Sequence, residues 1–341
     1  MYLKDLVDIQ MGQSPDSKFY NYDKIGLPFY QGKADFGRIN PTPKIWCSKS
    51  KKEAKPNDIL ISVRAPVGDL NINNEQSCIG RGLAAITCRP DVDMMYLYYY
   101  LKYLKPQLKH ISTGSTFESI NRSQLENLII DYKPYFEQIK ISNILQVVER
   151  QIEVKENLLR WYDLLVKSRF VEMFEVFNIN PNNYNTIKFK DLIERNNINE
   201  EDKVWLLNLD MIKPNTGEIV EKVYINRQNI PASSISFKKG TVLYSKLRPY
   251  LNKVVIADEN GYGTSELIPL NSYKNGLTAE YLAYYLRQDS FVDYIKDKVT
   301  GAKMPRVAMD ILRNIDIIQP NYIYQEQFSS FVNHVNKLKF D

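Results

Sequence analysis

Residues 135–177 read YFEQIKISNILQVVERQIEVKENLLRWYDLLVKSRFVEMFEVF, and this stretch decides the fold. Its apolar residues recur in alternating steps of three and four, interrupted only by Lys155 and Arg169. That heptad spacing predicts one long helix with an apolar seam. Pro134 before the stretch and Pro181 after it are helix breakers, so the helix is expected to end near both. The seam consists of Ile141, Leu145, Val148, Ile152, Leu159, Tyr162, Val166 and Met173.

Such a helix, roughly 60 Å long at about 1.5 Å per residue, needs a partner helix to bury its seam. The sequence offers a second helix over 325–340, with Phe328, Phe331, Val335 and Leu338 on one face, but it is only about a third as long. We therefore expect an exposed apolar strip near residues 162–174 that favours self-association. A long core helix of one large domain is the alternative interpretation.

Similar sequence lies on either side of the long helix. Residues 239–249 align with 57–66, 281–286 with 96–101, 300–302 with 113–115, 312–315 with 125–128, and 325–327 with 137–138. Both copies mix short apolar strands with a tyrosine-rich helix, and they keep the same order. The pattern predicts an α+β fold with two copies of one domain, although two unrelated α+β domains could also produce it. For the tyrosine-rich helices, core packing is favoured over base stacking.

The composition limits which partners and which cellular compartment the sequence allows. The 341 residues exceed the usual size of a single core, and 24 tyrosines with a net charge of +5 permit a polyanionic partner without requiring one. Cys47, Cys78 and Cys88 have no metal-ligand spacing and suit a reducing cytoplasm. The sequence has no apolar run long enough for a membrane span and no basic-then-apolar leader, so we expect a cytoplasmic protein.

The sequence shows little sign of an active site. It contains no phosphate-binding loop of the Gly-x-x-x-x-Gly-Lys-Ser/Thr type and no Asn/Asp-Pro-Pro-Tyr/Phe string of an amino-methyltransferase. His110 and His334 are the only histidines, which argues against a histidine metal cluster or a hydrolytic triad. We expect no catalytic residues and no metal site on this chain.

Binding chemistry is better represented, because many basic residues stand beside glycine, proline or aromatic residues. Arginine and lysine in such turns can meet base edges or clamp phosphates. For any one of them a solvated surface charge is the simpler interpretation. Arg64 and Arg248 stand out because each follows a strand and precedes a proline, although structural salt bridges would explain both equally well. The candidate DNA-contacting residues are Lys33, Arg38, Arg64, Arg81, Lys213, Arg227, Lys246, Arg248, Lys253, Lys303 and Arg306.

Several strings resemble the specificity subunit of type I restriction-modification systems. They are residues 58–69 (DILISVRAPVGD), 80–85 (GRGLAA), 114–120 (GSTFESI) and the helix entry at 134–138; the second copy is looser, at 240–249 and 300–307. The resemblance implies a first target-recognition domain (1–134), a central conserved spacer helix (135–178), a second target-recognition domain (179–320) and a short distal helix (321–341). The domains would be related by a pseudo-twofold axis, with the helices packed as a coiled coil.

The resemblance also implies function and partners. The chain would read a bipartite target in double-stranded DNA, one domain per half-site, and would dock two methylation subunits that carry S-adenosylmethionine. Restriction subunits using ATP and Mg²⁺ would join the same assembly, and the chain itself would hold no cofactor. A silent or truncated specificity cassette without autonomous binding is the alternative. A standalone nuclease or methyltransferase is a more distant one.

Overall fold

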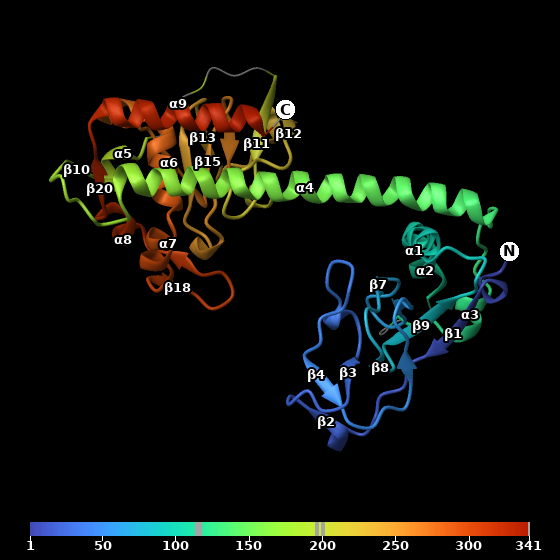
Figure 1. Cartoon of the computed structure of the whole chain (residues 1–341). Coiled ribbons are helices and arrows are strands. Elements are labelled where there is room, and N and C mark those ends of the chain that lie inside the picture. The colour runs from blue at the N-terminus through green and yellow to red at the C-terminus, as the bar shows by residue number, and fades with distance from the viewer. Residues whose placement is uncertain (113–117, 195–197, 199–201, 340–341) are drawn as a thin grey trace. The chain divides into compact units, whose positions relative to one another are not determined.

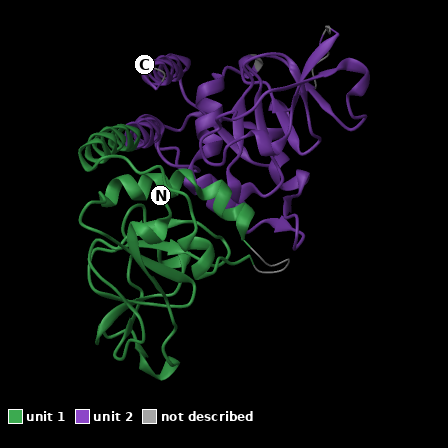
Figure 2. Ribbon diagram, turned by 90° about the vertical axis from the view of Figure 1, so that its right-hand side faces the viewer, with its two compact units in different colours: residues 1–154 green, residues 155–341 purple. Residues whose placement is uncertain are grey.

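The computed structural model describes residues 1–112, 118–194, 198 and 202–339, which form two compact units. Figure 2 colours the units separately: unit 1 comprises residues 1–154 and unit 2 residues 155–341. The boundary between them falls inside helix α4 (Tyr135–Phe174), which contributes its first half to unit 1 and its second half to unit 2 (Figure 1). The helix begins where the sequence predicts and ends three residues before Phe177, where Glu175 adopts a positive φ of 66°.

The described residues of unit 1 form two sheets and three short α-helices besides the first half of α4. One antiparallel sheet has the order β1 (Val7–Met11), β9 (Leu83–Cys88), β6 (Ile59–Ser62) and β7 (Leu70–Ile72). The other has the order β2 (Tyr20–Asn21), β4 (Ile45–Cys47), β3 (Leu27–Tyr30), β8 (Ser77–Ile79) and β5 (Glu53–Ala54). The helices are α1 (Met94–Tyr103), α2 (Lys105–Ile111) and α3 (Arg122–Glu126).

Strand β6 shows why unit 1 holds together. Its first three residues, Ile59 to Ile61, are apolar without alternation, and all four of its residues are buried. Ile59 and Ile61 belong to the main core beneath α1, whereas Leu60 belongs to a second cluster with Tyr30. A strand buried on both faces reads as a continuous apolar run, so this one sits at the centre of the unit.

Unit 2 repeats this mixture. One sheet has the order β12 (Val223–Asn226), β11 (Lys203–Leu207), β16 (Gly261–Gly263) and β13 (Ile235–Phe237). A second has the order β15 (Val254–Ile256), β14 (Val242–Ser245) and β17 (Leu267–Leu270). Two further pairs of strands are β10 (Asn185–Lys188) with β20 (Asp316–Gln319), and β18 (Val299–Thr300) with β19 (Arg306–Val307). The helices are α5 (Phe189–Leu192), α6 (Ala279–Arg287), α7 (Asp289–Lys296), α8 (Met309–Arg313) and α9 (Tyr322–Leu338). The predicted α+β class is confirmed.

The internal repeat is visible in matching contacts. Helices α1 and α6 each place an early tyrosine in the core, and each hydroxyl donates to a backbone carbonyl: Tyr96 to Asp131 and Tyr281 to Ile318. Both tyrosines are buried, as are Tyr98 and Tyr285, so core packing is the correct interpretation of these helices. The landmark at 113–115 lies outside the described residues.

Helix α9 runs antiparallel to the second half of α4. Phe328 packs edge-on against Phe170 and Phe174, and further along α9 the ammonium of Lys339 pairs with Asp163 at 2.6 Å. The expectation of an exposed strip at 162–174 is wrong for the face that carries Val166, Phe170 and Phe174, because α6 and α9 cover these residues in the core of unit 2. Leu164, Leu165 and Val171 remain exposed on other faces of this part of the helix, and most of the exposed apolar residues of α4 lie earlier.

Candidate nucleic-acid interface

Five of the predicted basic residues come together in unit 2. Strand β14 is fully buried, and the segment that leaves it pairs with β19: the Val307 N–H donates to the Lys246 carbonyl at 3.0 Å, and Leu247 bridges to Arg306. Lys303 lies in the loop between β18 and β19, three residues before Arg306. We call Lys246, Arg248, Lys253, Lys303 and Arg306 the unit 2 basic cluster.

Members of this cluster differ in how far protein partners occupy them. Arg306 donates to Glu266 through Nε (2.9 Å) and lies 2.8 Å from it through Nη2. Lys253 donates to the Leu209 carbonyl at 2.5 Å, and burial, helped by the charge of Arg248, lowers its pKa. Both side chains are thus occupied by protein partners. The side chains of Lys246, Arg248 and Lys303 are the better candidates for contacting phosphates.

Two predicted residues of unit 2 lie outside the cluster. Lys213 pairs with Glu218 at 2.7 Å within its own turn. Arg227 lines a shallow surface hollow with Asp202 and Gln228.

In unit 1 the predicted basic residues also fall into two groups, one exposed on loops and one beside acidic side chains. Arg64 and Arg81 are exposed on neighbouring loops, because the Val63 N–H donates to the carbonyl of Gly82, next to Arg81. Lys33 is paired with Asp69 at 2.8 Å, and Arg38 lies 3.7 Å from Glu153 on α4.

The pairing of Arg64 with Arg248 as equivalent residues is wrong by one position. Arg64 forms the bridge to Ser119 that Leu247 forms to Arg306. The next residue in each copy donates its backbone N–H to a carbonyl of the facing segment: Ala65 to Glu118 at 3.0 Å, and Arg248 to Pro305 at 2.8 Å. Both arginines nevertheless stand on the same loop of the two units.

The middle of α4 carries two apolar rows. The predicted seam, which we call the first row, is buried only at Val166; Leu145, Val148, Ile152 and Leu159 are exposed. A second row lies beside it and was missed: Ile144, Val147, Gln151, Val154, Leu158, Trp161 and Leu165, all exposed. These residues also alternate in steps of three and four, so counting a second ladder would have found them. Lys140, Arg150 and Lys155 are the charged residues nearest to it on the helical wheel between 140 and 160.

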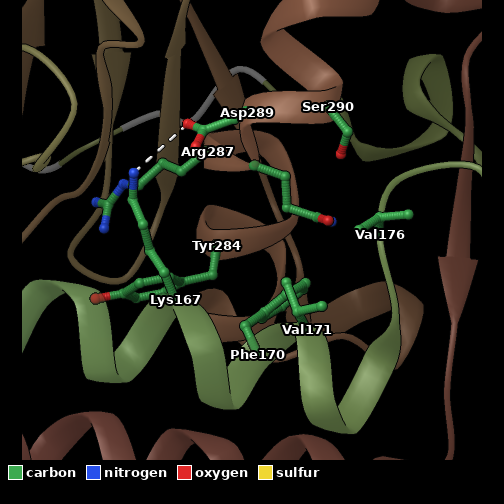
Figure 3. A pocket seen from close by; sticks show the side chains of 9 residues that line it. Lys167, Phe170, Val171, Val176, Tyr284, Arg287, Asp289 and Ser290 are labelled. Atoms are coloured by element: carbon green, nitrogen blue, oxygen red, sulfur yellow. Dashed lines mark ion pairs between the residues drawn. The ribbon is translucent and has the colours of Figure 1, made fainter.

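A pocket of about 190 Å³ lies between the end of α4 and the α6–α7 junction (Figure 3). Phe170, Val171 and Val176 supply its apolar wall, and Lys167 pairs with Asp289 across 3.5 Å at one side. Arg287 is buried there and donates to the Val254 carbonyl. The pocket is lined by none of the predicted DNA-contacting residues, so it is separate from the basic cluster.

Two further features bear on function. Among the described residues there is no group of three or more His, Cys, Asp or Glu side chains placed to hold a metal ion. Of the helices in the described part of the chain, none is both long enough and apolar enough to cross a membrane.

Comparison with known proteins finds similarity to specificity subunits of type I restriction enzymes. Residues 1–160 match the family model described as "Type I restriction modification DNA specificity domain". The chain is 45% identical over 148 residues to a putative type I restriction enzyme MjaX specificity subunit of Methanocaldococcus jannaschii, an alignment that covers 43% of this chain and 35% of that protein. It is 23% identical over 372 aligned positions to the MjaIX specificity subunit of the same organism, covering 97% of this chain and 84% of that protein.

A solved structure shares the fold along the whole chain. The S subunit of a type I restriction-modification system from M. genitalium superposes with a TM-score of 0.58 at 14% identity, covering 99% of this chain and 89% of that one.

Proposed function

We propose, from the membership of this chain in the type I restriction-modification specificity-subunit family, that it reads a bipartite target in double-stranded DNA, one unit per half-site. The observation that carries the proposal is the repeat itself. Each unit presents an exposed arginine, Arg64 or Arg248, on the same loop after a buried strand. Two copies of one reading surface on one chain suit a target with two separated parts.

The chemistry of the loops supports DNA as the ligand. Phosphate contacts from lysine and arginine supply most of the affinity, and arginine can also read guanine in the major groove. In unit 2, Arg248 and Lys303 are exposed and Lys246 is partly exposed, side by side on paired backbone segments. The remaining predicted residues, among them Arg81 and Arg227, stay candidates for contacts at other points of the surface.

We propose that α4 is both the spacer between half-sites and the docking surface for two methylation subunits. Its two exposed apolar rows exceed what α9 covers, and exposed apolar patches of this kind mark protein interaction sites. Because basic residues lie beside the second row, it suits a partner helix whose apolar face is flanked by acidic residues. S-adenosylmethionine, ATP and Mg²⁺ would be bound by the methylation and restriction subunits, and catalysis would take place there, in the cytoplasm.

Mapping of methylated adenines in genomic DNA tests the proposal. The chain is expressed with the methylation subunit encoded beside it, and that subunit is expressed alone as the control. A two-part motif that appears only when the chain is present supports the specificity role. If both proteins are expressed in folded form and no motif appears, the silent-cassette alternative replaces it.

A further inference from the structure

The loop between β18 and β19 is braced through its backbone. Three consecutive carbonyl oxygens accept hydrogen bonds from arginines: Lys303 from Arg248 Nη2 (3.3 Å), Met304 from Arg306 Nη1 (3.3 Å), and Pro305 from the Arg248 N–H (2.8 Å). Three donors aimed at three adjacent carbonyls hold the tip in one conformation.

The two arginines are themselves held in place. Arg306 is bound by Glu266, and Arg248 adopts a left-handed conformation with φ of 49° while its carbonyl accepts from the Leu251 N–H at 2.9 Å. A non-glycine residue in this region is unfavourable and persists only where the surroundings enforce it. Gly301, with φ of 96°, makes the tight turn that opens the loop. The tip is therefore preorganised.

The side chain that this braced tip presents is apolar. Met304 is 47% exposed and lies along the chain between Lys303 and Arg306, two members of the unit 2 basic cluster. Single exposed apolar residues are ordinary on protein surfaces. This one differs because five hydrogen bonds and an ion pair maintain the backbone that carries it. Methionine is among the side chains that proteins insert between base steps, with basic residues alongside on the phosphates.

The sequence of the other copy points to a role shared by both half-sites. Residues 113–119 read TGSTFES and residues 300–306 read TGAKMPR, so position 117 carries phenylalanine where Met304 stands. The neighbouring basic residues are not repeated: Thr116 aligns with Lys303, and Ser119 with Arg306. Residue 117 lies outside the described part of the structure, so the inference concerns Met304. A large apolar residue that recurs without its polar neighbours suits a sequence-independent task.

We propose that Met304 inserts between base pairs of the half-site bound by unit 2 and unstacks them, so that the target adenine leaves the duplex more readily. Methyltransferases must turn their target base out of the helix, and unstacking is part of the free energy that this step requires. The proposal rests on the proposed function, because it needs a methylation subunit acting at a recognised half-site.

The test uses the chain assembled with its methylation subunit and a duplex bearing the mapped motif. 2-Aminopurine replaces the target adenine of the unit 2 half-site, since its fluorescence rises on unstacking. We expect Met304→Ala to keep the motif but to lower both the fluorescence rise and the single-turnover methylation rate about tenfold, in line with the unstacking cost. A mismatch opposite the adenine should restore most of the rate, and Met304→Leu should resemble the parent chain. Val220→Ala, at another exposed apolar residue of unit 2, is the matched control.

The outcomes separate the two proposals. If the parent chain directs no methylation to any motif, the proposed function fails. If it does, and Met304→Ala has unchanged fluorescence and an unchanged methylation rate, the proposed insertion of Met304 is overturned. Loss of the motif by Met304→Ala with an unchanged Tm would also overturn it, because Met304 would then read sequence. A rate defect that the mismatch does not rescue overturns it as well.

Discussion

Gln138 and Gln325 occupy the same position in the two units and make the same three hydrogen bonds. Each is completely buried near the start of a helix, Gln138 on α4 and Gln325 on α9. The Oε1 atom of each accepts at 2.9 Å from the backbone N–H of an N-cap residue, Asp93 of α1 or Thr278 of α6. The Nε2 atoms donate to backbone carbonyls: Asp91 and Lys133 for Gln138, and Gly276 and Pro320 for Gln325. Each glutamine thus ties a tyrosine-rich helix to a spacer helix.

Replacing this glutamine should destabilise the unit that contains it. Gln325→Leu leaves one N–H and two carbonyls buried without partners, and we expect the free energy of unfolding to fall by about 3 kcal/mol. Urea unfolding measures the loss, and amide exchange at Thr278 localises it. Gln327→Leu is the matched control, because Gln327 is exposed on the same helix. Equal effects of the two substitutions would contradict the assignment.

This pair also shows where sequence reasoning succeeds and stops. The alignment of 325–327 with 137–138 located the repeat, but it paired Gln327 with Gln138, because Gln325 and Gln327 look alike in the sequence until burial distinguishes them. Arg64 and Arg248 were matched by their places between a strand and a proline, and the backbone pairing shifts that match by one. Local spacing predicted α4 and its first row. Which part of that row is buried depends on α6 and α9, whose positions no local pattern contains.

Asp69 should stabilise unit 1 only while it is ionised. Burial of its carboxyl opposes ionisation, but the ammonium groups of Lys105 at 2.6 Å and Lys33 at 2.8 Å outweigh burial and lower the pKa of Asp69. Because the folded-state pKa is the lower one, this stabilisation is present above the unfolded-state pKa, about 3.9, and is lost as the pH falls below it through the folded-state pKa. The difference in unfolding free energy between the parent chain and Asp69→Asn should be constant from pH 7 to 5 and shrink by pH 3.

The control for this prediction is Asp23→Asn, at an exposed carboxylate of the same unit. A parent-minus-Asp69→Asn difference as large at pH 3 as at pH 7 would show that the ion pairs do not cause it.

The basic residues of unit 2 should separate by salt dependence. If Lys246 and Lys303 contact phosphates, replacing either with glutamine should weaken DNA binding of the assembled complex and reduce the slope of log K against log salt by about 0.9. Lys213→Gln should leave the slope unchanged, because Lys213 is paired with Glu218 away from the cluster. Fluorescence anisotropy over a salt series measures both quantities. Identical slopes for all three variants would remove the cluster from the interface.

The isolated chain should self-associate through the exposed part of the first row of α4. Leu145, Ile152 and Leu159 lie on one face without a partner among the described residues, and burying them against another helix is favourable. We expect sedimentation to show a concentration-dependent dimer, and Ile152→Glu with Leu159→Glu to give a monomer of unchanged Tm. A stable monomer of the parent chain at all concentrations would count against this.

The second row of α4 should bind the methylation subunit. Trp161 is 66% exposed and Val154 59%, so a change to glutamate at both positions should leave the Tm of the chain unchanged. Large exposed aromatic residues in an interface commonly contribute 2 kcal/mol or more, which predicts a loss of affinity of about 30-fold or greater.

Because Arg150 flanks this row, its change to glutamate should weaken binding further as salt is lowered, opposite to the parent chain. Calorimetric titration of the methylation subunit into each variant measures these effects. Val166→Glu is the contrasting substitution: Val166 is buried in unit 2, so it should lower the Tm itself. Full affinity in the Val154→Glu, Trp161→Glu variant would assign the docking surface elsewhere.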